Sequence, residues 1–136
     1  MSNSVPLSPD VVKLLEDKNL AFVATIMSNG YPQITPTWID LVDNTILINT
    51  AEGRVKQKNL LRDPRIAISI VDRNNQYNMV TIRGKVIEQT TQGADEHIDK
   101  MAKKYLGVNK YPFRIQSEKR ILLKITPEKI FHMAPQ

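Results

Sequence analysis

The chain has 136 residues, of which 41% are hydrophobic and 24% are charged, and this balance is typical of one ordinary globular domain spanning residues 1–136. It contains no cysteine, which excludes disulfides, iron–sulfur clusters and thiolate nucleophiles, and its two histidines, His97 and His132, are too few to indicate a metal site. No apolar run is long enough to span a membrane, and the first residues do not resemble a leader peptide, so we expect a cytoplasmic protein without a membrane partner.

The first half of the sequence predicts two helices and three strands. Ser8-Pro9-Asp10 combines an N-cap, a proline at the first helical position and a first-turn acid, which together predict the start of a helix. Asn29-Gly30 is a strong hairpin signal, and Pro36 places the following strand at an edge or a bulge because proline cannot donate to a neighbouring strand. We therefore predict a helix ending near residue 19, strands over 20–28, 33–42 and 45–50, and a helix over 54–62.

The second half predicts three more strands and the longest helix. Ile66, Ile68 and Ile70 alternate as in a half-buried strand, and apolar residues after Gly93 recur at helical spacing until a stop at Gly107. The predicted elements are strands over 66–71 and 78–89, a helix over 93–105, a loop over 108–118, and a strand over 120–133 that is interrupted at Pro127. Short strands with inserted helices predict a mainly β fold, a small Greek-key barrel of six strands, and the sequence has no Gly-x-Gly-x-x-Gly motif of a Rossmann sheet.

Basic residues concentrate in two short segments. Residues 54–65 carry five basic side chains and one acidic one, and residues 100–124 carry eight basic side chains and one acidic one. Two local patches suit a compact anion such as phosphate better than a long duplex. The second segment is otherwise typical of a solvated face, and its basic residues include Lys103, Lys104, Lys110, Arg114, Lys119 and Arg120.

The first basic segment follows the end of a predicted strand. Gly53 permits a sharp turn there, and the free backbone N–H groups at the start of the next helix point outward. Arg54, Lys56 and Lys58 place cationic donors beside these groups. The segment predicts a monophosphate site, and the alternative is a solvated basic helix.

Four stretches of the sequence occur in an order and spacing found in a known family. They are residues 23–38 (VATIMSNGYPQITPTW), 53–65 (GRVKQKNLLRDPR), 80–84 (VTIRG) and 104–107 (KYLG). In these stretches the chain resembles the pyridoxamine-phosphate-oxidase-like split-barrel proteins, and within them the F-420-dependent branch. The resemblance implies a six-stranded split β-barrel that forms a homodimer and binds its cofactor in a groove between the two subunits.

The same resemblance implies which residues bind the cofactor. Those that would hold the phosphate are Arg54 and Lys56, with Val55, Lys58 and Asn59 nearby. Those that would line the ring are Gln33, Thr35, Pro36, Thr37 and Trp38, with Asn49 and Thr50 at the adjoining strand end. Tyr77 and the 108–118 loop would close the groove from the other subunit. Trp38 is also typical of core or interface filler.

This cofactor class determines what the protein itself must do. A flavin or deazaflavin carries the hydride, so the chain needs only to position the ring, hold the phosphate and exclude water, and no catalytic side chain is required. The resemblance therefore implies an oxidoreductase that uses coenzyme F-420 to transfer a hydride to or from a small organic substrate. In an F-420 protein, the basic residues of segment 100–124 would meet the acidic oligoglutamate tail of the cofactor, which FMN lacks, instead of forming a solvated face. The alternatives are an FMN-dependent oxidase or reductase, a cofactor carrier without turnover, and a nucleic-acid-binding module. The last is the weakest, because residues 54–65 contain no aromatic residue and Phe22 and Phe113 lie in apolar contexts rather than forming stacking platforms.

Overall fold

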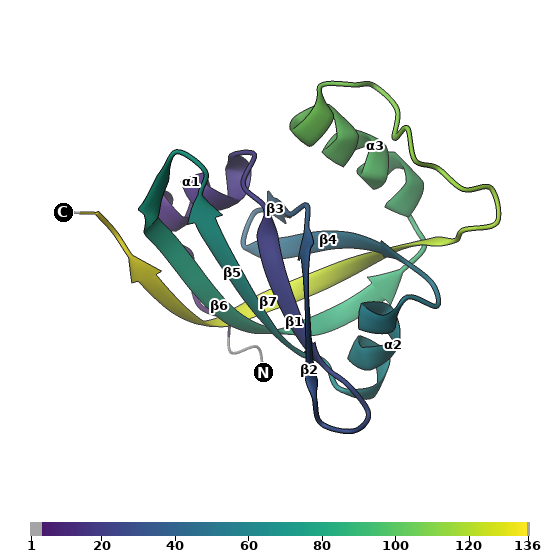
Figure 1. Ribbon diagram of the computed structural model, residues 1–136, viewed down its shortest axis with the longest axis horizontal. Helices are drawn as coiled ribbons and strands as arrows, with labels where there is room; N and C mark the ends of the chain where they lie inside the picture. The colour runs from purple at the N-terminus through teal and green to yellow at the C-terminus, as the bar shows by residue number, and fades with distance from the viewer. Residues whose placement is uncertain (1–3, 136) are drawn as a thin grey trace.

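The computed structural model describes residues 4–135, which form seven strands and three helices (Figure 1). In chain order these are α1 (Pro9–Glu16), β1 (Ala21–Ile26), β2 (Pro32–Thr37), β3 (Asp40–Val42), β4 (Thr45–Ala51), α2 (Val55–Arg62), β5 (Arg65–Asp72), β6 (Asn75–Thr90), α3 (Ala94–Leu106) and β7 (Arg120–Met133). All neighbouring strands are antiparallel, in the order β2-β1-β5-β6-β7-β4-β3. The predicted mainly β fold of split-barrel type is confirmed, with seven strands in place of six.

The additional strand arises because the predicted strand over 33–42 is two strands on opposite edges of the sheet. β2 pairs with β1 and β3 pairs with β4, and only Trp38 and Ile39 connect them. A link this short spans roughly 10 Å, whereas the outer strands of a flat seven-stranded sheet would lie roughly 29 Å apart. The sheet must therefore curl until its two edges approach each other, which produces the barrel.

Side chains of α3 hold the chain where it changes edge. The backbone N–H of Ile39 donates to the Tyr105 hydroxyl at 3.1 Å, and the backbone carbonyl of Ile39 accepts from Lys104 Nζ at 2.8 Å. Both polar groups of Ile39 are thus satisfied outside a strand ladder, as a buried backbone requires. Since these partners lie more than sixty residues away in the sequence, a local pattern cannot reveal the break.

Two prolines occupy the positions that a sheet allows. Pro36 lies on the edge strand β2, as predicted. Pro127 does not interrupt β7: it pairs with Gly84 of β6 at a shift in register, so the strand continues through a bulge. A side chain at Gly84 would collide with the Thr126 carbonyl, which explains why only glycine fits opposite this bulge.

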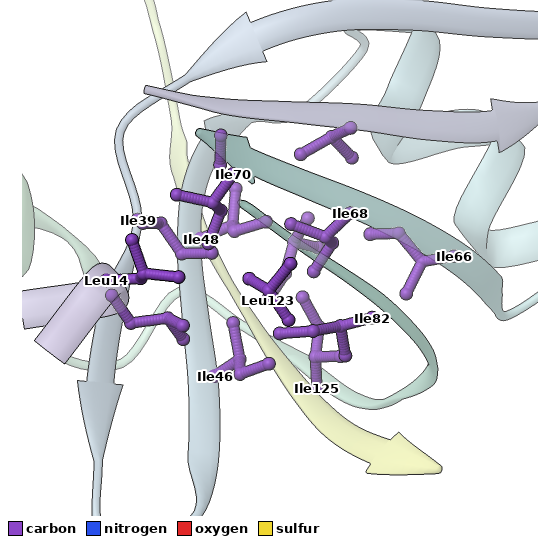
Figure 2. Packing of buried hydrophobic residues seen from close by; sticks show 14 of the residues in the cluster. Leu14, Ile39, Ile46, Ile48, Ile66, Ile68, Ile70, Ile82, Leu123 and Ile125 are labelled. Carbon is purple, nitrogen blue, oxygen red and sulfur yellow. The ribbon is translucent and has the colours of Figure 1, made fainter. Parts of the chain in front are cut away.

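The core is a cluster of aliphatic side chains inside the curled sheet (Figure 2). Its members from β4, β5, β6 and β7 are almost completely buried and include Ile46, Ile48, Ile68, Ile70, Ile82, Leu123 and Ile125. α1 adds Leu14 and Leu15, and α2 adds Leu60. α3 contributes to a separate small cluster, in which Ala94 packs with Leu47 and Leu122. No helix within residues 4–135 is long and apolar enough to cross a membrane.

Candidate cofactor-binding site

A pocket of about 280 Å³ lies where the ends of β2 and β4 meet α2, α3 and the loop after α3. Figure 1 shows α3 with this loop on one side of the paired ends of β4 and β7, and α2 on the other. The lining combines cationic, polar and apolar side chains: Leu20, Pro36, Thr37, Trp38, Asn49, Thr50, Arg54, Lys56, Ile98, Met101, Tyr111, Phe113 and Arg120.

The N-terminus of α2 opens towards this pocket. Gly53 adopts a left-handed conformation (φ 90°), and its N–H donates to the side chain of Gln57 at 2.9 Å, so this part of the turn is fixed. Arg54 is the N-cap residue, but its side chain does not cap the helix, and the first turn contains no acidic residue. The N–H groups at the start of a helix need an acceptor and carry a partial positive charge. The geometry therefore suits an anion at this end of α2.

Three cations and one carboxylate gather at the start of α2, beside the pocket. Glu118 accepts from Arg54 Nη2 at 2.8 Å and from Arg120 Nη1 at 2.6 Å. Burial alone would raise the pKa of Glu118, but the hydrogen bonds and charges of the two arginines outweigh it and lower the pKa. Glu118 is therefore ionised and neutralises one of the positive charges.

Lys56 supplies the third cation, and nothing neutralises it. Its ammonium group has no hydrogen-bond or ion-pair partner among residues 4–135. Burial lowers its pKa, and the positive charges of Arg54 and Arg120 lower it further. A lysine that is partly desolvated beside two arginines experiences an excess of positive charge. The group of Arg54, Lys56 and Arg120, called here the cation cluster, therefore has two positive charges more than Glu118 balances.

Arg120 is the member of the cation cluster that the sequence did not reveal. It was expected on a solvated face, but it is only 7% exposed, and this expectation is wrong. Its Nε donates to Asn49 Oδ1 at 2.9 Å, and its guanidinium carbon lies 5.4 Å from the centre of the Tyr111 ring. The antiparallel pairing of β4 with β7 places Arg120 opposite Ala51, close to the start of α2. This pairing joins residues far apart in the sequence, so no local signal indicated it.

Aromatic residues form another wall of the pocket. Trp38 stacks on Tyr105 with ring centres 5.3 Å apart and an angle of 7°, and it meets Tyr111 edge to face at 6.0 Å. Phe113 in turn packs edge to face on Tyr111 and is 64% exposed. The backbone N–H of Tyr111 donates to Asp99 at 2.8 Å, which holds the loop against α3. The rings of Trp38, Tyr111 and Phe113 thus meet edge to face and form an apolar wall that can pack against a planar ring.

Comparison with known proteins identifies the family. The model of the pyridoxamine 5′-phosphate oxidase family matches residues 7–134, which is almost the whole chain. The chain belongs to the pyridoxamine 5′-phosphate oxidase family. This is a family of flavin-binding oxidoreductases, so the recognition made from the four sequence stretches is confirmed. No curated protein matches the chain in sequence.

Solved structures with the same fold agree with this membership. An F-420 reductase is 23% identical, with a TM-score of 0.82 over 93% of this chain and 98% of that one. HupZ from Group A Streptococcus is 26% identical, with a TM-score of 0.66 over 93% of this chain and 94% of that one. General Stress Protein 26 from Bacillus anthracis is 13% identical, with a TM-score of 0.71 over 93% of each chain. At such identities these structures establish the fold.

Seven of the thirteen residues that the family resemblance implied line this pocket together. They are Pro36, Thr37, Trp38, Asn49, Thr50, Arg54 and Lys56. The residues that line it without having been implied are Leu20, Ile98, Met101 and Arg120. Tyr111 and Phe113 also line it and belong to the 108–118 loop, which was expected to close the groove from the other subunit but here borders the pocket of its own chain.

The other implied residues lie outside the pocket in the single chain. Val55 and Lys58 are exposed on α2, and Tyr77 is exposed at the start of β6, in a different hollow beside Met133. Asn59 is buried, donates to Thr25 at 3.0 Å, and accepts from Arg62, so its side chain fastens α2 to the sheet.

Two implied residues of β2 share its inner face. Gln33 accepts from Thr25 at 3.4 Å. The hydroxyl of Thr35 is buried and has no hydrogen-bond partner within residues 4–135, whereas a buried hydroxyl ordinarily has one. Thr35 therefore has an unused polar group on the strand whose C-terminal end borders the pocket.

Proposed function

We propose that the protein binds a phosphorylated flavin-type cofactor in this pocket, with coenzyme F-420 as the first candidate, and transfers a hydride to or from a small organic substrate. The observation that carries the proposal is the cation cluster at the uncapped start of α2, in which Glu118 balances only one of three positive charges. A phosphate ester carries up to two negative charges and three strong acceptor oxygens. Its charge and its acceptors match the positive charge and the donors present there.

The chain's own residues would bind the cofactor, orient its ring and shield it from water. Lys56, Arg54 and the first N–H groups of α2 would hold the phosphate, and the wall formed by Trp38, Tyr111 and Phe113 would orient the ring and exclude water. When bound, the flavin or deazaflavin supplies the hydride chemistry. No side chain of the pocket then needs to transfer a proton, which fits a lining composed of cations, amides, hydroxyls and apolar groups.

F-420 and FMN differ in a feature that bears on the second basic segment. F-420 has an acidic oligoglutamate tail that FMN lacks, and the fold shared with an F-420 reductase supports F-420. FMN is the second candidate, because most cations that would meet such a tail are already paired. Lys110 lies 3.8 Å from Asp99, Arg114 contacts Asp95 and Asp99, and Lys119 lies 4.0 Å from Glu52.

We further propose that a second copy of the chain completes the site. The pocket volume of about 280 Å³ is at the lower limit for ligand sites, so one chain encloses only part of a cofactor. The outward face of the β1–β2 hairpin is apolar and exposed: Phe22 lies beside Pro36 there, Ala24 lies beside Ile34, and Ile34 is 64% exposed. Light scattering should give a dimer mass for the parent, and Ile34→Lys should shift it towards the monomer. A monomeric parent at micromolar concentration would contradict the dimer.

The test of cofactor binding is an absorbance titration of the protein with F-420 and with FMN. We expect saturation by F-420 at lower concentration. Lys56→Ala should weaken binding of the preferred cofactor by about 10- to 150-fold, because one charge-assisted hydrogen bond contributes about 1.5–3 kcal/mol. Lys58→Ala is the matched control on the exposed side of the same helix and should bind as the parent does.

Two results would separate the possible failures. If Lys56→Ala and Lys58→Ala bind both cofactors as tightly as the parent, the phosphate does not lie at the cation cluster. If neither cofactor binds the parent, the proposed function is wrong. Turnover is followed separately, by the absorbance of the reduced cofactor with a panel of small unsaturated or oxidised organic molecules. Tight binding without turnover of any of them would favour the carrier alternative.

A further inference from the structure

A chain of buried polar side chains lies behind the cation cluster, and the proposed function does not use it. His97, on α3, is 8% exposed. Its Nδ1 lies 3.2 Å from Asn49 Nδ2, and its Nε2 lies 3.0 Å from Asp40 Oδ2. Asn49 continues the chain to Arg120, since its Oδ1 accepts from Arg120 Nε at 2.9 Å. Three segments that are distant in the sequence thus meet through one continuous set of hydrogen bonds.

The direction of each hydrogen bond follows from the charge of Asp40. Burial would raise the pKa of Asp40, but the hydrogen bonds from His97 and Lys100 outweigh it and lower the pKa to about 2. An ionised carboxylate only accepts, so His97 Nε2 carries the hydrogen. In a neutral imidazole the other nitrogen, Nδ1, must then be an acceptor. Asp40 therefore determines which tautomer His97 adopts.

The acceptor Nδ1 of His97 acts together with the Ala94 carbonyl to orient the amide of Asn49. Nδ2 of Asn49 donates both to His97 Nδ1 and to the backbone carbonyl of Ala94, at 2.8 Å. With both amide hydrogens used on that side, the amide oxygen of Asn49 has to face Arg120. The reversed amide would place an N–H against Arg120 Nε and an oxygen against the Ala94 carbonyl, and both contacts are repulsive.

Arg120 is thereby fixed with one edge of its guanidinium group free. Nε is held by Asn49, Nη1 is held by Glu118, and Nη2 has no hydrogen-bond partner in the part of the chain that the structure describes. Since Arg120 lines the pocket, Nη2 can donate to an anion there. The position of this donor depends on a histidine that itself does not line the pocket.

We infer that His97 is a positioning residue for anion binding: through Asn49 it holds Arg120 in the orientation that presents Nη2 to the phosphate of the ligand. This inference rests on the anion site of the proposed function. It adds that α3, through His97, contributes to phosphate affinity without touching the phosphate, whereas Asp40 only sets which nitrogen of His97 is the acceptor.

Two substitutions separate the two hydrogen bonds of His97. His97→Asn places an amide oxygen near the position of Nδ1, so the acceptor for Asn49 is retained while the bond to Asp40 is lost. His97→Gln places an amide N–H near the position of Nε2, so the bond to Asp40 is retained while the acceptor for Asn49 is lost. The phosphate contribution to binding is measured as the ratio of the dissociation constants for riboflavin and FMN, and inorganic phosphate is titrated as a second probe.

We expect His97→Gln to lower the riboflavin/FMN ratio and to weaken phosphate binding by about 10-fold, as the loss of one buried hydrogen bond allows. His97→Asn should remain within about threefold of the parent in both measurements. A purely structural role would lower the melting temperature of both variants. It would leave the riboflavin/FMN ratio the same in His97→Gln and His97→Asn. Equal ratios in the two variants would therefore overturn the inference.

One further measurement needs no variant. In ¹⁵N NMR of the parent protein, His97 should show a protonated Nε2 and an unprotonated Nδ1, and the opposite tautomer would overturn the inference even if both variants failed to fold. The outcome also separates the two proposals. If the parent binds phosphate but neither flavin nor F-420, the proposed function fails while the role of His97 is still decided by phosphate. If the parent does not bind phosphate either, both proposals are wrong.

Discussion

The two basic segments of the chain differ in how their charges are paired in the fold. In residues 54–65, Lys56 has no partner in the described part of the chain and borders the pocket. In residues 100–124, carboxylates from elsewhere take up most of the charge: Lys100 pairs with Asp40, Lys110 and Arg114 with Asp99, and Lys119 with Glu52. The segment with the larger net charge in the sequence therefore contributes one cation, Arg120, to the pocket, whereas residues 54–65 contribute two, Arg54 and Lys56.

Two lysines show the same difference at the level of single side chains. Burial is the main cause that lowers the pKa of both Lys56 and Lys104. Lys104 nevertheless donates to the carbonyls of Leu15 and Ile39, at 2.6 and 2.8 Å, and thereby connects α1, α3 and the link between β2 and β3. A desolvated lysine can thus be a structural tie or a ligand donor, and its acceptors decide which.

The largest effect that we predict is for Arg120→Met. The substitution leaves the buried oxygen of Asn49 without its donor and removes one of the two partners of Glu118. Removing one partner of a buried charged pair should reduce the free energy of unfolding by about 3 kcal/mol, measured by urea denaturation. Arg114→Met is the control in the same basic segment and should change it by less than about 1 kcal/mol, because Arg114 is 41% exposed. Similar losses in both variants would contradict the distinction between buried and neutralised surface cations.

The second prediction concerns pH and the carboxylate that pairs with the second segment. The pKa of Asp40 falls from 3.8 to about 2 on folding, so the unfolded chain binds more protons between these values. The stabilisation by Asp40 is therefore complete above about pH 4 and is lost as pH falls towards 2. Asp40→Asn should lower the free energy of unfolding at pH 7 by about 2–3 kcal/mol, and most of the difference from the parent should be lost as pH falls to about 2. A difference that stays constant over this pH range would show that the charge of Asp40 contributes nothing.

Local patterns predicted most of the elements correctly. The N-cap before α1, the hairpin at Gly30, the proline on edge strand β2 and the helix after Gly53 each depend on neighbouring residues, and the structure has all of them. The break between β2 and β3 depends instead on Lys104 and Tyr105, whose side chains satisfy the backbone of Ile39. A sequence pattern based on β-branched residues cannot reveal such a long-range contact.

The residues of the candidate site also fall into those that local sequence indicates and those that depend on distant contacts. Arg54 and Lys56 were predictable because a glycine turn, a helix start and cations adjoin one another in the sequence. Arg120 was not, because its burial results from the pairing of β4 with β7 and from Asn49 opposite the guanidinium group. Met101 and Phe113 join the pocket only after α3 and its loop fold back onto the sheet.

The third prediction tests the structural tie of the second segment. Lys104→Met removes the donor of the Leu15 carbonyl and the close donor of the Ile39 carbonyl, because the single hydrogen of the Tyr105 hydroxyl goes to the Asn19 carbonyl at 2.7 Å. A buried carbonyl left without a donor costs about 1–3 kcal/mol, so we expect a loss of about 2 kcal/mol in the free energy of unfolding. Lys103→Met, one position earlier on an exposed part of α3, is the control and should be nearly neutral. An unchanged Lys104→Met protein would show that these hydrogen bonds add no net stability.

The smallest effect should have the opposite sign. Lys56 is desolvated beside Arg54 and Arg120 with no acceptor among the described residues, so Lys56→Met should raise the melting temperature of the cofactor-free protein by a few degrees while it weakens cofactor binding. The direction of this stability change can be checked by measuring the free energy of unfolding as a function of pH. Because the folded pKa lies below the ordinary 10.5, the unfolded chain binds more protons in between, and the stability of the parent rises with pH there. The advantage of Lys56→Met should therefore be present at pH 7 and shrink as pH approaches 10.5. If Lys56→Met is instead less stable than the parent at pH 7, Lys56 is a structural tie like Lys104, and the contrast between these two lysines fails.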